Sequence, residues 1–217
     1  MSCTLCLNNI SAKIAEKTIF SNLSLNAGHK DKIAIIGSNG CGKTTLLEII
    51  GGLRNPDSGE VEIFHNTILN LKEYQKYRYL IGYLFQDSDD QFICPNVFED
   101  VVFGLLTIGI QRSIADKRAE DILKELDIWH LRDKIVFHLS GGEKKLVALA
   151  GVLVNEPKIL LLDEPTAALD FDMQEKVADL LIKLDITQII VSHDKEFISR
   201  VANKMYYLNK DGLKLGD

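Results

Sequence analysis

The sequence predicts an α/β protein built around a mainly parallel β-sheet. Three apolar runs support this class, because residues 33–36, 159–162 and 189–191 each pass directly into polar or glycine residues. The first run is followed by a glycine-rich loop and then by the apolar, helix-prone segment 46–50. Short apolar runs of this kind are typical of parallel strands buried on both faces, and sites gather where such strands end.

The other elements follow from the periodicity along the chain. The first 30 residues and the segment 59–68 suit antiparallel strands, which predicts an N-terminal antiparallel β subdomain. Residues 87–155 are largely helical in pattern and predict a helical subdomain inserted into the core. No repeat or linker interrupts residues 1–217, so we expect a single domain. Core strands are expected at 32–37, 80–86, 159–163, 188–192 and 205–208, and helices of the insertion at 97–106, 114–126 and 141–154.

Length and charge restrict the function. A chain of 217 residues can form one well-packed α/β domain and is too short for a fused membrane domain. No window approaches 18 consecutive apolar residues and no signal peptide is visible, so we expect a soluble intracellular protein. The net charge of −6 argues against nucleic acid as a partner.

The four cysteines are too few and too scattered for a disulfide framework, which is expected of a reducing compartment. They are Cys3, Cys6, Cys41 and Cys94. Cys3 and Cys6 form a C-x-x-C pair, which we expect to lie on alternate faces of a strand. No second pair completes a zinc site.

Residues 37–45 read Gly-Ser-Asn-Gly-Cys-Gly-Lys-Thr-Thr and predict a phosphate-binding loop between a strand and a helix. Its glycines let backbone N–H groups surround a triphosphate at the positive end of the helix. Lys43 is expected to reach the β- and γ-phosphates, and the Thr44 hydroxyl to bind Mg²⁺. A simple glycine-rich turn is the alternative interpretation. The candidate nucleotide-binding residues are Gly37, Ser38, Asn39, Gly40, Cys41, Gly42, Lys43, Thr44 and Thr45.

A second set of motifs follows about a hundred residues later, where Leu-Ser-Gly-Gly-Glu at 139–143 precedes a helical stretch and the apolar strand at 159–162. With these motifs the chain resembles the nucleotide-binding subunit of ATP-binding-cassette (ABC) transporters, and the fold that this implies is a P-loop NTPase core. The matching motifs are Walker A at 37–45, the Q-loop at Gln86, the signature at 139–143, Walker B at 159–163, the D-loop at 168–170 and the switch residue His193.

The resemblance implies hydrolysis of ATP with Mg²⁺. Asp163 and Gln86 are then expected to bind the metal together with Thr44. Gln86 is also a catalytic candidate, because its amide oxygen can hold water. Glu164 is the candidate base that polarises the attacking water. His193 is expected to donate a hydrogen bond to the γ-phosphate and to pair with Glu164. The plainer interpretations are two solvated acids at the end of one strand and a histidine that caps another.

The resemblance also implies a head-to-tail dimer, either a homodimer or a heterodimer with a second ABC ATPase. Ser140, Gly141 and Gly142 lie at a helix N-terminus and are expected to bind the nucleotide of the opposing subunit, far from Lys43 of their own chain. Asp170 of the D-loop joins this set. The expected location is the cytoplasmic face of the cell membrane, in contact with transmembrane subunits.

Two positions depart from the family pattern. Glu143 replaces the usual glutamine at the end of the signature, where an acid suits the helix dipole and is less welcome beside a triphosphate. The segment 9–17 lacks the aromatic residue that the family places under the adenine. Ile14 is the aliphatic candidate for that position, which predicts weaker stacking and looser base selectivity.

Residues 87–104 resemble the ATPases of energy-coupling-factor importers, which carry cobalt, nickel, biotin and other vitamins. The membrane subunits decide the solute. Two alternatives remain open: a non-transport soluble ABC ATPase, and a regulatory ATP-binding module. We also expect an acidic, partly apolar groove after Gln86 that receives a basic helix of the membrane subunit. Its acids are Asp87, Asp89, Asp90, Glu99 and Asp100.

Overall fold

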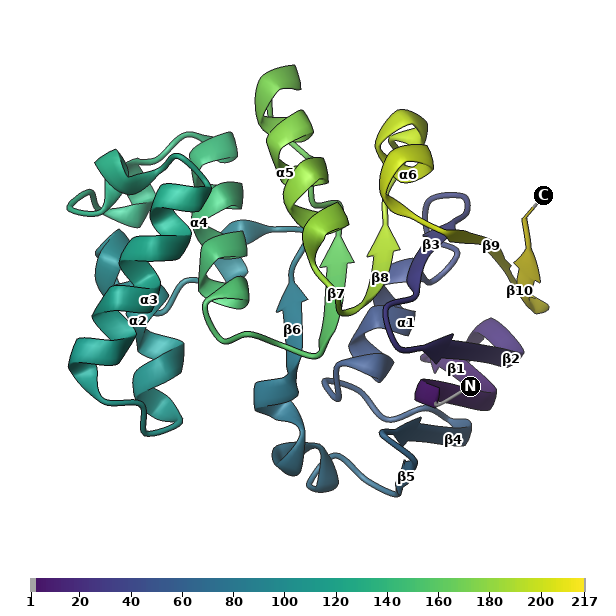
Figure 1. Cartoon of the computed structure of the whole chain (residues 1–217). Coiled ribbons are helices and arrows are strands. Elements are labelled where there is room, and N and C mark those ends of the chain that lie inside the picture. The colour runs from purple at the N-terminus through teal and green to yellow at the C-terminus, as the bar shows by residue number, and fades with distance from the viewer. Residues whose placement is uncertain (1–2, 217) are drawn as a thin grey trace.

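The computed structural model describes residues 3–216, which form two β-sheets and the helices packed around them (Figure 1). Within these residues the central sheet has six strands in the order β10-β9-β3-β8-β7-β6. Strands β9, β3, β8, β7 and β6 run parallel, and β10 pairs antiparallel with β9 at the edge. The bounds are β3 Lys32–Ile36, β6 Ile81–Leu84, β7 Ile159–Asp163, β8 Thr187–Val191, β9 Lys204–Asn209 and β10 Gly212–Leu215.

The second sheet is antiparallel, has the order β2-β1-β4-β5 in the described chain, and forms the predicted N-terminal β subdomain. Its strands are β1 Cys3–Ile14, β2 Lys17–Gly28, β4 Ser58–Ile63 and β5 Asn66–Ile68. The α/β fold class and the parallel core are therefore confirmed. Strand β10 is an addition that the periodicity did not indicate.

Six α-helices surround the sheets in the part of the chain that the structure describes. They are α1 Lys43–Ile50, α2 Val97–Thr107, α3 Arg112–Glu125, α4 Gly141–Leu153, α5 Phe171–Lys183 and α6 Lys195–Val201. Short 3₁₀ turns lie at Glu73–Lys76, Arg78–Leu80, Ser88–Asp90, Trp129–Leu131 and Val136–His138. Helices α2, α3 and α4 form a lobe to one side of the central sheet (Figure 1).

The central sheet separates two hydrophobic cores, and strand β7 shows why its sequence is continuously apolar. Ile159 and Leu161 pack with α1 and the antiparallel sheet, whereas Leu160 and Leu162 pack with α4, α5 and the helical lobe. All four side chains are fully buried. A strand covered on both faces has no position for a polar residue until it ends, so the first acids appear at the carboxyl end.

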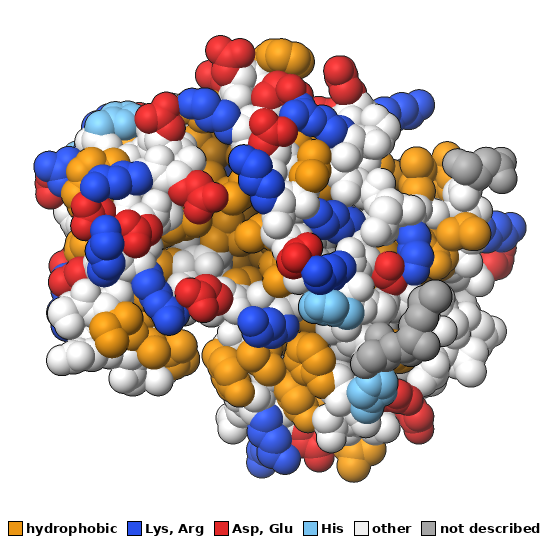
Figure 2. Space-filling view, in the orientation of Figure 1, with side chains coloured by type: hydrophobic (Ala, Val, Ile, Leu, Met, Phe, Trp, Pro, Cys, Tyr) orange, Lys and Arg blue, Asp and Glu red, His pale blue; other side chains and the backbone are white. Residues whose placement is uncertain are grey.

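Charged side chains of both signs are intermixed on the face drawn in Figure 2, and hydrophobic side chains show in the hollow beside α5. None of the helices described between residues 3 and 216 is both long and apolar enough to cross a membrane.

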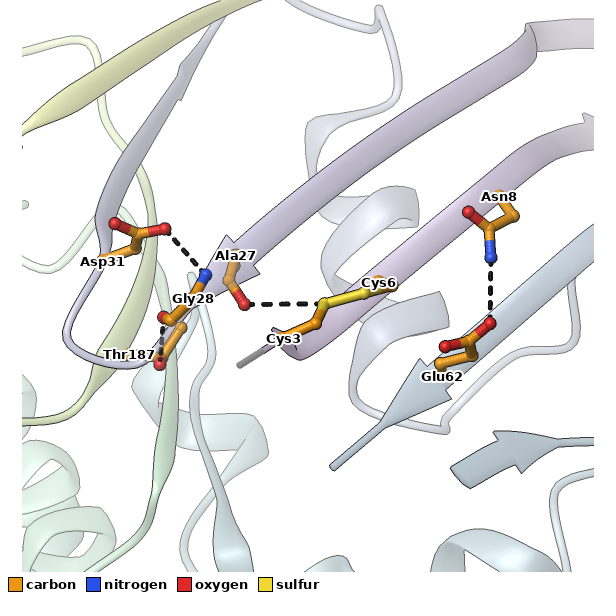
Figure 3. The surroundings of a disulfide bond; sticks show 8 residues. All are labelled: Cys3, Cys6, Asn8, Ala27, Gly28, Asp31, Glu62 and Thr187. Carbon is orange, nitrogen blue, oxygen red and sulfur yellow. Dashed lines mark hydrogen bonds between the residues drawn. A yellow bond between two sulfur atoms is a disulfide. The ribbon is translucent and has the colours of Figure 1, made fainter. Parts of the chain in front are cut away.

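Cys3 and Cys6 form a disulfide, which corrects the expectation that this pair lies on alternate faces of a strand (Figure 3). Strand β1 pairs with β2 so that Cys3 lies opposite Gly28 and Cys6 opposite Asn26, with a register shift between Cys3 and Leu5. A bulge of one residue reverses the alternation of side chains, and it brings positions three apart onto the same side. Periodicity alone could not show this irregularity.

Candidate active site

The phosphate-binding loop occupies residues 37–42, between β3 and α1. Helix α1 begins at Lys43, and Gly42 precedes it with φ 105°, in the left-handed region. A Cβ at Gly42 would lie 2.4 Å from Cγ2 of Ile19, so both the backbone conformation and the close approach of β2 require glycine here. Helix α1 therefore points its N-terminus, with unpaired N–H groups, into the loop.

A cavity of about 520 Å³ opens above this loop, between β2, α1 and the ends of β7 and β8. Lys43 is 8% exposed, and its Nζ donates hydrogen bonds to the carbonyl oxygens of Gly37 at 2.9 Å and Ser38 at 3.3 Å. The ammonium is thus held inside the curve of the loop, where a phosphate group would meet it. The cavity is lined by Ile14, Ile19, Asn39, Gly40, Gly42, Lys43, Thr44, Thr45, Gln86, Asp163, Glu164, Ala167 and His193.

Thr44 and Asp163 are brought together from positions 119 residues apart: the Thr44 hydroxyl donates a hydrogen bond of 2.7 Å to Oδ2 of Asp163. Asp163 is the last residue of β7 and is 1% exposed. Burial raises the pKa of its carboxyl group, while the Thr44 hydrogen bond and the charges of Lys145 and Lys43 oppose that shift. A hydroxyl beside a buried carboxylate is an all-oxygen pair that suits Mg²⁺.

Glu164 and His193 also meet, at the ends of the neighbouring strands β7 and β8. Oε2 of Glu164 accepts a hydrogen bond of 3.2 Å from the main-chain N–H of His193, and Oε1 lies 3.5 Å from Nε2 of the same histidine. Glu164 has φ 50°, a left-handed conformation that is uncommon for glutamate, and its N–H donates to the Val191 carbonyl oxygen. This left-handed backbone conformation directs the Glu164 carboxylate toward β8 rather than away from the sheet.

Gln86 follows β6 and lines both the cavity above the phosphate loop and a neighbouring cavity of about 690 Å³. Thr44 and Asp163 line the same two cavities. The structure thus brings Gln86, Thr44 and Asp163 to one place, as the sequence predicts for a metal site. Their roles as ligands remain predictions.

The signature residues begin helix α4, and the D-loop packs against them. Gly141 lines the cavity of about 690 Å³, and a Cβ at Gly142 would lie 2.8 Å from the carbonyl oxygen of Ala168. Asp170 caps helix α5 by accepting a hydrogen bond from the Met173 N–H at 2.9 Å. Asp170 therefore has a structural task in the isolated chain, and its contact with nucleotide remains a prediction.

Glu143 forms a capping box with Ser140, which accounts for the departure from the family pattern. Its carboxylate accepts from the Ser140 main-chain N–H at 2.8 Å, and its own N–H donates to the Ser140 hydroxyl at 3.3 Å. The hydrogen bond from the Ser140 main-chain N–H is the main cause that holds the pKa of Glu143 below its usual value. Lys134 lowers the pKa further. The acid is thus turned back onto its own helix.

Aliphatic side chains form the wall of the cavity on the side of the β1–β2 hairpin. Ile14, at the end of β1, is 49% exposed and lines the cavity together with Ile19 of β2. None of the described residues that line this cavity is phenylalanine, tyrosine or tryptophan. Ile14 therefore lies on the cavity wall, and its contact with the adenine remains a prediction. Ile19 is an addition that the sequence did not indicate, because a β-branched residue in a hairpin resembles an ordinary strand position.

Most of the acids after Gln86 also form contacts within the chain, and their role as a receptor for a basic partner remains a prediction. Asp100 is the clearest example, because one carboxylate oxygen accepts N–H groups at 2.7 Å from both Ile93 and Cys94. Two further acids pair with side chains of the helical lobe: Asp89 with Lys144 and Glu99 with Arg112, each at 2.7 Å.

These features together define a P-loop nucleoside triphosphatase: a loop and helix N-terminus for phosphates, an oxygen pair for a cation and a glutamate beside a histidine. The family profile described as "ABC transporter" matches residues 20–167. The chain belongs to the ABC transporter family and is an ATP-hydrolysing, ATP-binding subunit.

Two relatives illustrate the similarity in sequence. A putative ABC transporter ATP-binding protein of Brucella suis biovar 1 (strain 1330) is 42% identical over 209 residues, which cover 96% of this chain and 87% of the relative. The energy-coupling factor transporter ATP-binding protein EcfA of Methanoculleus marisnigri is 38% identical over 87% of this chain and 69% of that protein.

Two solved structures share the fold. CbiO1 from Clostridium perfringens, described as part of the ABC transporter complex CbiONQ, superimposes with a TM-score of 0.86 at 32% identity and covers 99% of this chain and 88% of its own. The ATP-binding cassette MJ0796, solved as a dimer in a post-hydrolysis state with ADP and Pi, has a TM-score of 0.89 at 31% identity, over 98% of each chain.

Proposed function

We propose that this subunit powers an importer that takes up cobalt, nickel or a vitamin through separate membrane subunits, and that it works at the cytoplasmic face of the membrane. The observation that carries the catalytic part is the meeting of the Thr44–Asp163 and Glu164–His193 pairs in one cavity with Lys43. The importer branch is supported by the similarity to an energy-coupling factor ATPase and to CbiO1.

Each side chain has a definite task in this proposal. Lys43 and the loop N–H groups bind the β- and γ-phosphates, and Thr44, Asp163 and Gln86 would hold Mg²⁺, which neutralises phosphate charge when bound. Glu164 takes a proton from the attacking water. His193 donates to the γ-phosphate and orients Glu164.

We further propose that two such cassettes, identical or different, enclose two nucleotides head to tail. The N-terminus of α4 then faces the triphosphate held by the opposite loop, as an anion site that is incomplete within one chain. The dimeric state of MJ0796 supports this arrangement.

A groove between the central sheet and the helical lobe is the proposed contact for the membrane subunit. This groove of about 280 Å³ lies between β6, α2 and α4, and Tyr79 and Ile108 on its walls are 53% and 48% exposed. An apolar helix seated there would touch the strand that leads to Gln86. Movement of Gln86 with the nucleotide would thereby reach the membrane protein.

The deciding experiment is purification of the tagged chain from detergent-solubilised membranes of its own cell, with identification of the integral proteins that accompany it. Deletion of the gene should lower cellular cobalt or nickel, or create a vitamin requirement, and the Lys43→Ala variant should fail to restore uptake. Partners that are ribosomal, or normal uptake in the deletion strain, would contradict the proposal.

A further inference from the structure

Lys145 is a buried lysine whose contacts the proposed chemistry does not use. It is the fifth residue of helix α4 and is 3% exposed. Its Nζ donates to the carbonyl oxygens of Phe85 at 3.0 Å and Gln86 at 2.7 Å. Lysine is almost never fully buried without partners, and here the partners are main-chain atoms of a segment 59 and 60 residues earlier in the chain.

The surroundings explain how a cation is tolerated there. Burial lowers the pKa of Lys145, and the negative charges of Asp163, Asp87 and Glu164 act in the opposite direction. Two carbonyl oxygens receive two of the three ammonium protons. A buried ammonium without these acceptors would be strongly unfavourable, so the contact holds the carbonyls of Phe85 and Gln86 in place.

A second side chain ties the same segment to the same helix. Oε1 of Gln91 accepts from the Phe85 N–H at 3.2 Å, and its Nε2 donates to the Ala148 carbonyl oxygen at 2.8 Å. Both polar atoms of the Phe85 main chain are therefore bound by side chains that belong to α4 or are anchored on it. Hydrogen bonds therefore join the Gln86 segment to α4 at two positions, Lys145 and Ala148.

The first turn of α4, just before Lys145, lies against the D-loop. Its first residues are Gly141 and Gly142, whose Cα positions approach Ala168 so closely that an added Cβ would lie 3.3 Å from its Cβ and 2.8 Å from its carbonyl oxygen. The N-terminal part of α4 thus contacts both the Gln86 main chain, through Lys145, and the D-loop, through Gly141 and Gly142.

We propose that Lys145 is a positioning residue that locks the Gln86 main chain to helix α4, so that a displacement of Gln86 by nucleotide is passed to the Ser140–Gly142 loop. The inference rests on the proposed roles of Gln86 and of that loop. Lys145 acts through Gln86 and touches no reacting atom. Loss of the lock leaves nucleotide binding by the Lys43 loop intact and impairs assembly of the catalytic state.

Lys144 provides the matched control, because it is the neighbouring lysine on the same helix. Its Nζ pairs with the carboxylate of Asp89, and the two side chains are 18% and 48% exposed. Because the Asp89 carboxylate is half exposed, solvent screens this pair. Lys144→Met should therefore remove a lysine from α4 without releasing the Gln86 main chain.

The first test is kinetic. In Lys145→Met, kcat for ATP should fall about 10- to 100-fold, and KM should stay within about twofold of the parent. Lys145→Arg should recover much of the lost kcat. Lys144→Met should keep the parental kcat and KM. In a Gln86→Ala background, Lys145→Met should lower single-turnover hydrolysis by less than about twofold, because the side chain that it positions is gone. An equal loss in both backgrounds, or an unchanged kcat, would overturn the proposal.

The second test needs no hydrolysis. Hydrogen exchange of residues 139–146 is measured with and without a non-hydrolysable ATP analogue, at a concentration where light scattering shows monomers. The parent and Lys144→Met should show a nucleotide-dependent change that Lys145→Met lacks, although all three bind the analogue. A change retained in Lys145→Met, or missing in the parent, would overturn the proposal. Failure of the parent to bind the analogue would instead contradict the proposed function.

Discussion

Glu164 and His193 form a two-point contact across the ends of β7 and β8: Oε2 of Glu164 accepts from the His193 N–H at 3.2 Å, while Oε1 lies 3.5 Å from Nε2. The carboxylate side chain is 16% exposed and the imidazole 55% exposed. The Glu164 carboxylate is therefore bound by the main chain just after β8, and the His193 imidazole lies on its solvent-exposed side. This is the geometry expected of a base oriented by a neighbouring group.

Glu164→Gln should abolish turnover and preserve nucleotide binding, because the amide keeps the shape of the carboxylate and cannot accept a proton. We expect a loss of about 10² to 10⁴ in kcat, together with an ATP-bound dimer that survives size-exclusion chromatography. Asp185→Asn, which removes a charge from the exposed Lys30–Asp185 pair, is the comparison for a charge loss outside the site. A Glu164→Gln variant that stays monomeric and hydrolyses ATP at the parental rate would show that the base lies elsewhere.

Alkylation of Cys41 should inactivate the ATPase, because the thiol belongs to the phosphate-binding loop and is partly exposed. Cys3 and Cys6 are joined in a disulfide. Burial and the charge of Asp100 raise the pKa of the Cys94 thiol, so that less thiolate is present near neutral pH and reaction there is slow.

N-ethylmaleimide with peptide mapping is the measurement for Cys41. Labelling and inactivation should run in parallel, ATP should slow both, and Cys41→Ala should resist. Equal inactivation of Cys41→Ala would assign the effect to another thiol.

Ile14→Tyr should tighten ATP binding and sharpen the preference for adenine. Ile14 is 49% exposed at the cavity wall, so a larger ring can be placed there without disturbing the core. Aromatic stacking contributes about 0.5–1.5 kcal/mol, which corresponds to roughly a 2- to 10-fold lower Kd. Titrations of ATP and GTP against the parent, Ile14→Leu and Ile14→Tyr provide the check; an unchanged ATP/GTP ratio in Ile14→Tyr would place the base away from Ile14.

Ile108→Glu should weaken the membrane complex and spare the ATPase of the isolated chain, because Ile108 lies in the groove between β6 and α2 and far along the chain from the phosphate loop. A buried charge at the centre of an apolar contact costs well over 1 kcal/mol, so co-purification of the membrane subunits should fall about tenfold.

The control for this groove is Ile114→Glu on α3, since Ile108 and Ile114 are each 48% exposed. Quantitative mass spectrometry of the affinity-purified complex compares the two variants. Similar recovery from both would move the contact to another surface.

The sequence alone determined the features that depend on neighbouring residues. The motif at 37–45 needs glycines, a lysine and a threonine at set spacing, and the structure places the glycines between β3 and α1 and the lysine and threonine in the first turn of α1. The apolar run of β7 likewise indicates a strand buried on both faces, with its first acid at the end. Such features are local, because the conformation of a short segment follows from its own residue types and burial.

Only the tertiary structure decided which distant residues meet. The bulge in β1 that brings Cys3 and Cys6 together depends on pairing with β2, and the Lys144–Asp89 pair joins positions 55 residues apart; neither leaves a mark in periodicity. In the sequence Lys145 is one of two adjacent lysines near the start of a helical segment, and only the fold places the Gln86 carbonyl beside its ammonium. The reason is physical: a buried charge acquires its role from the dielectric and the hydrogen-bond partners around it, and these are supplied by segments that become neighbours only when the chain folds.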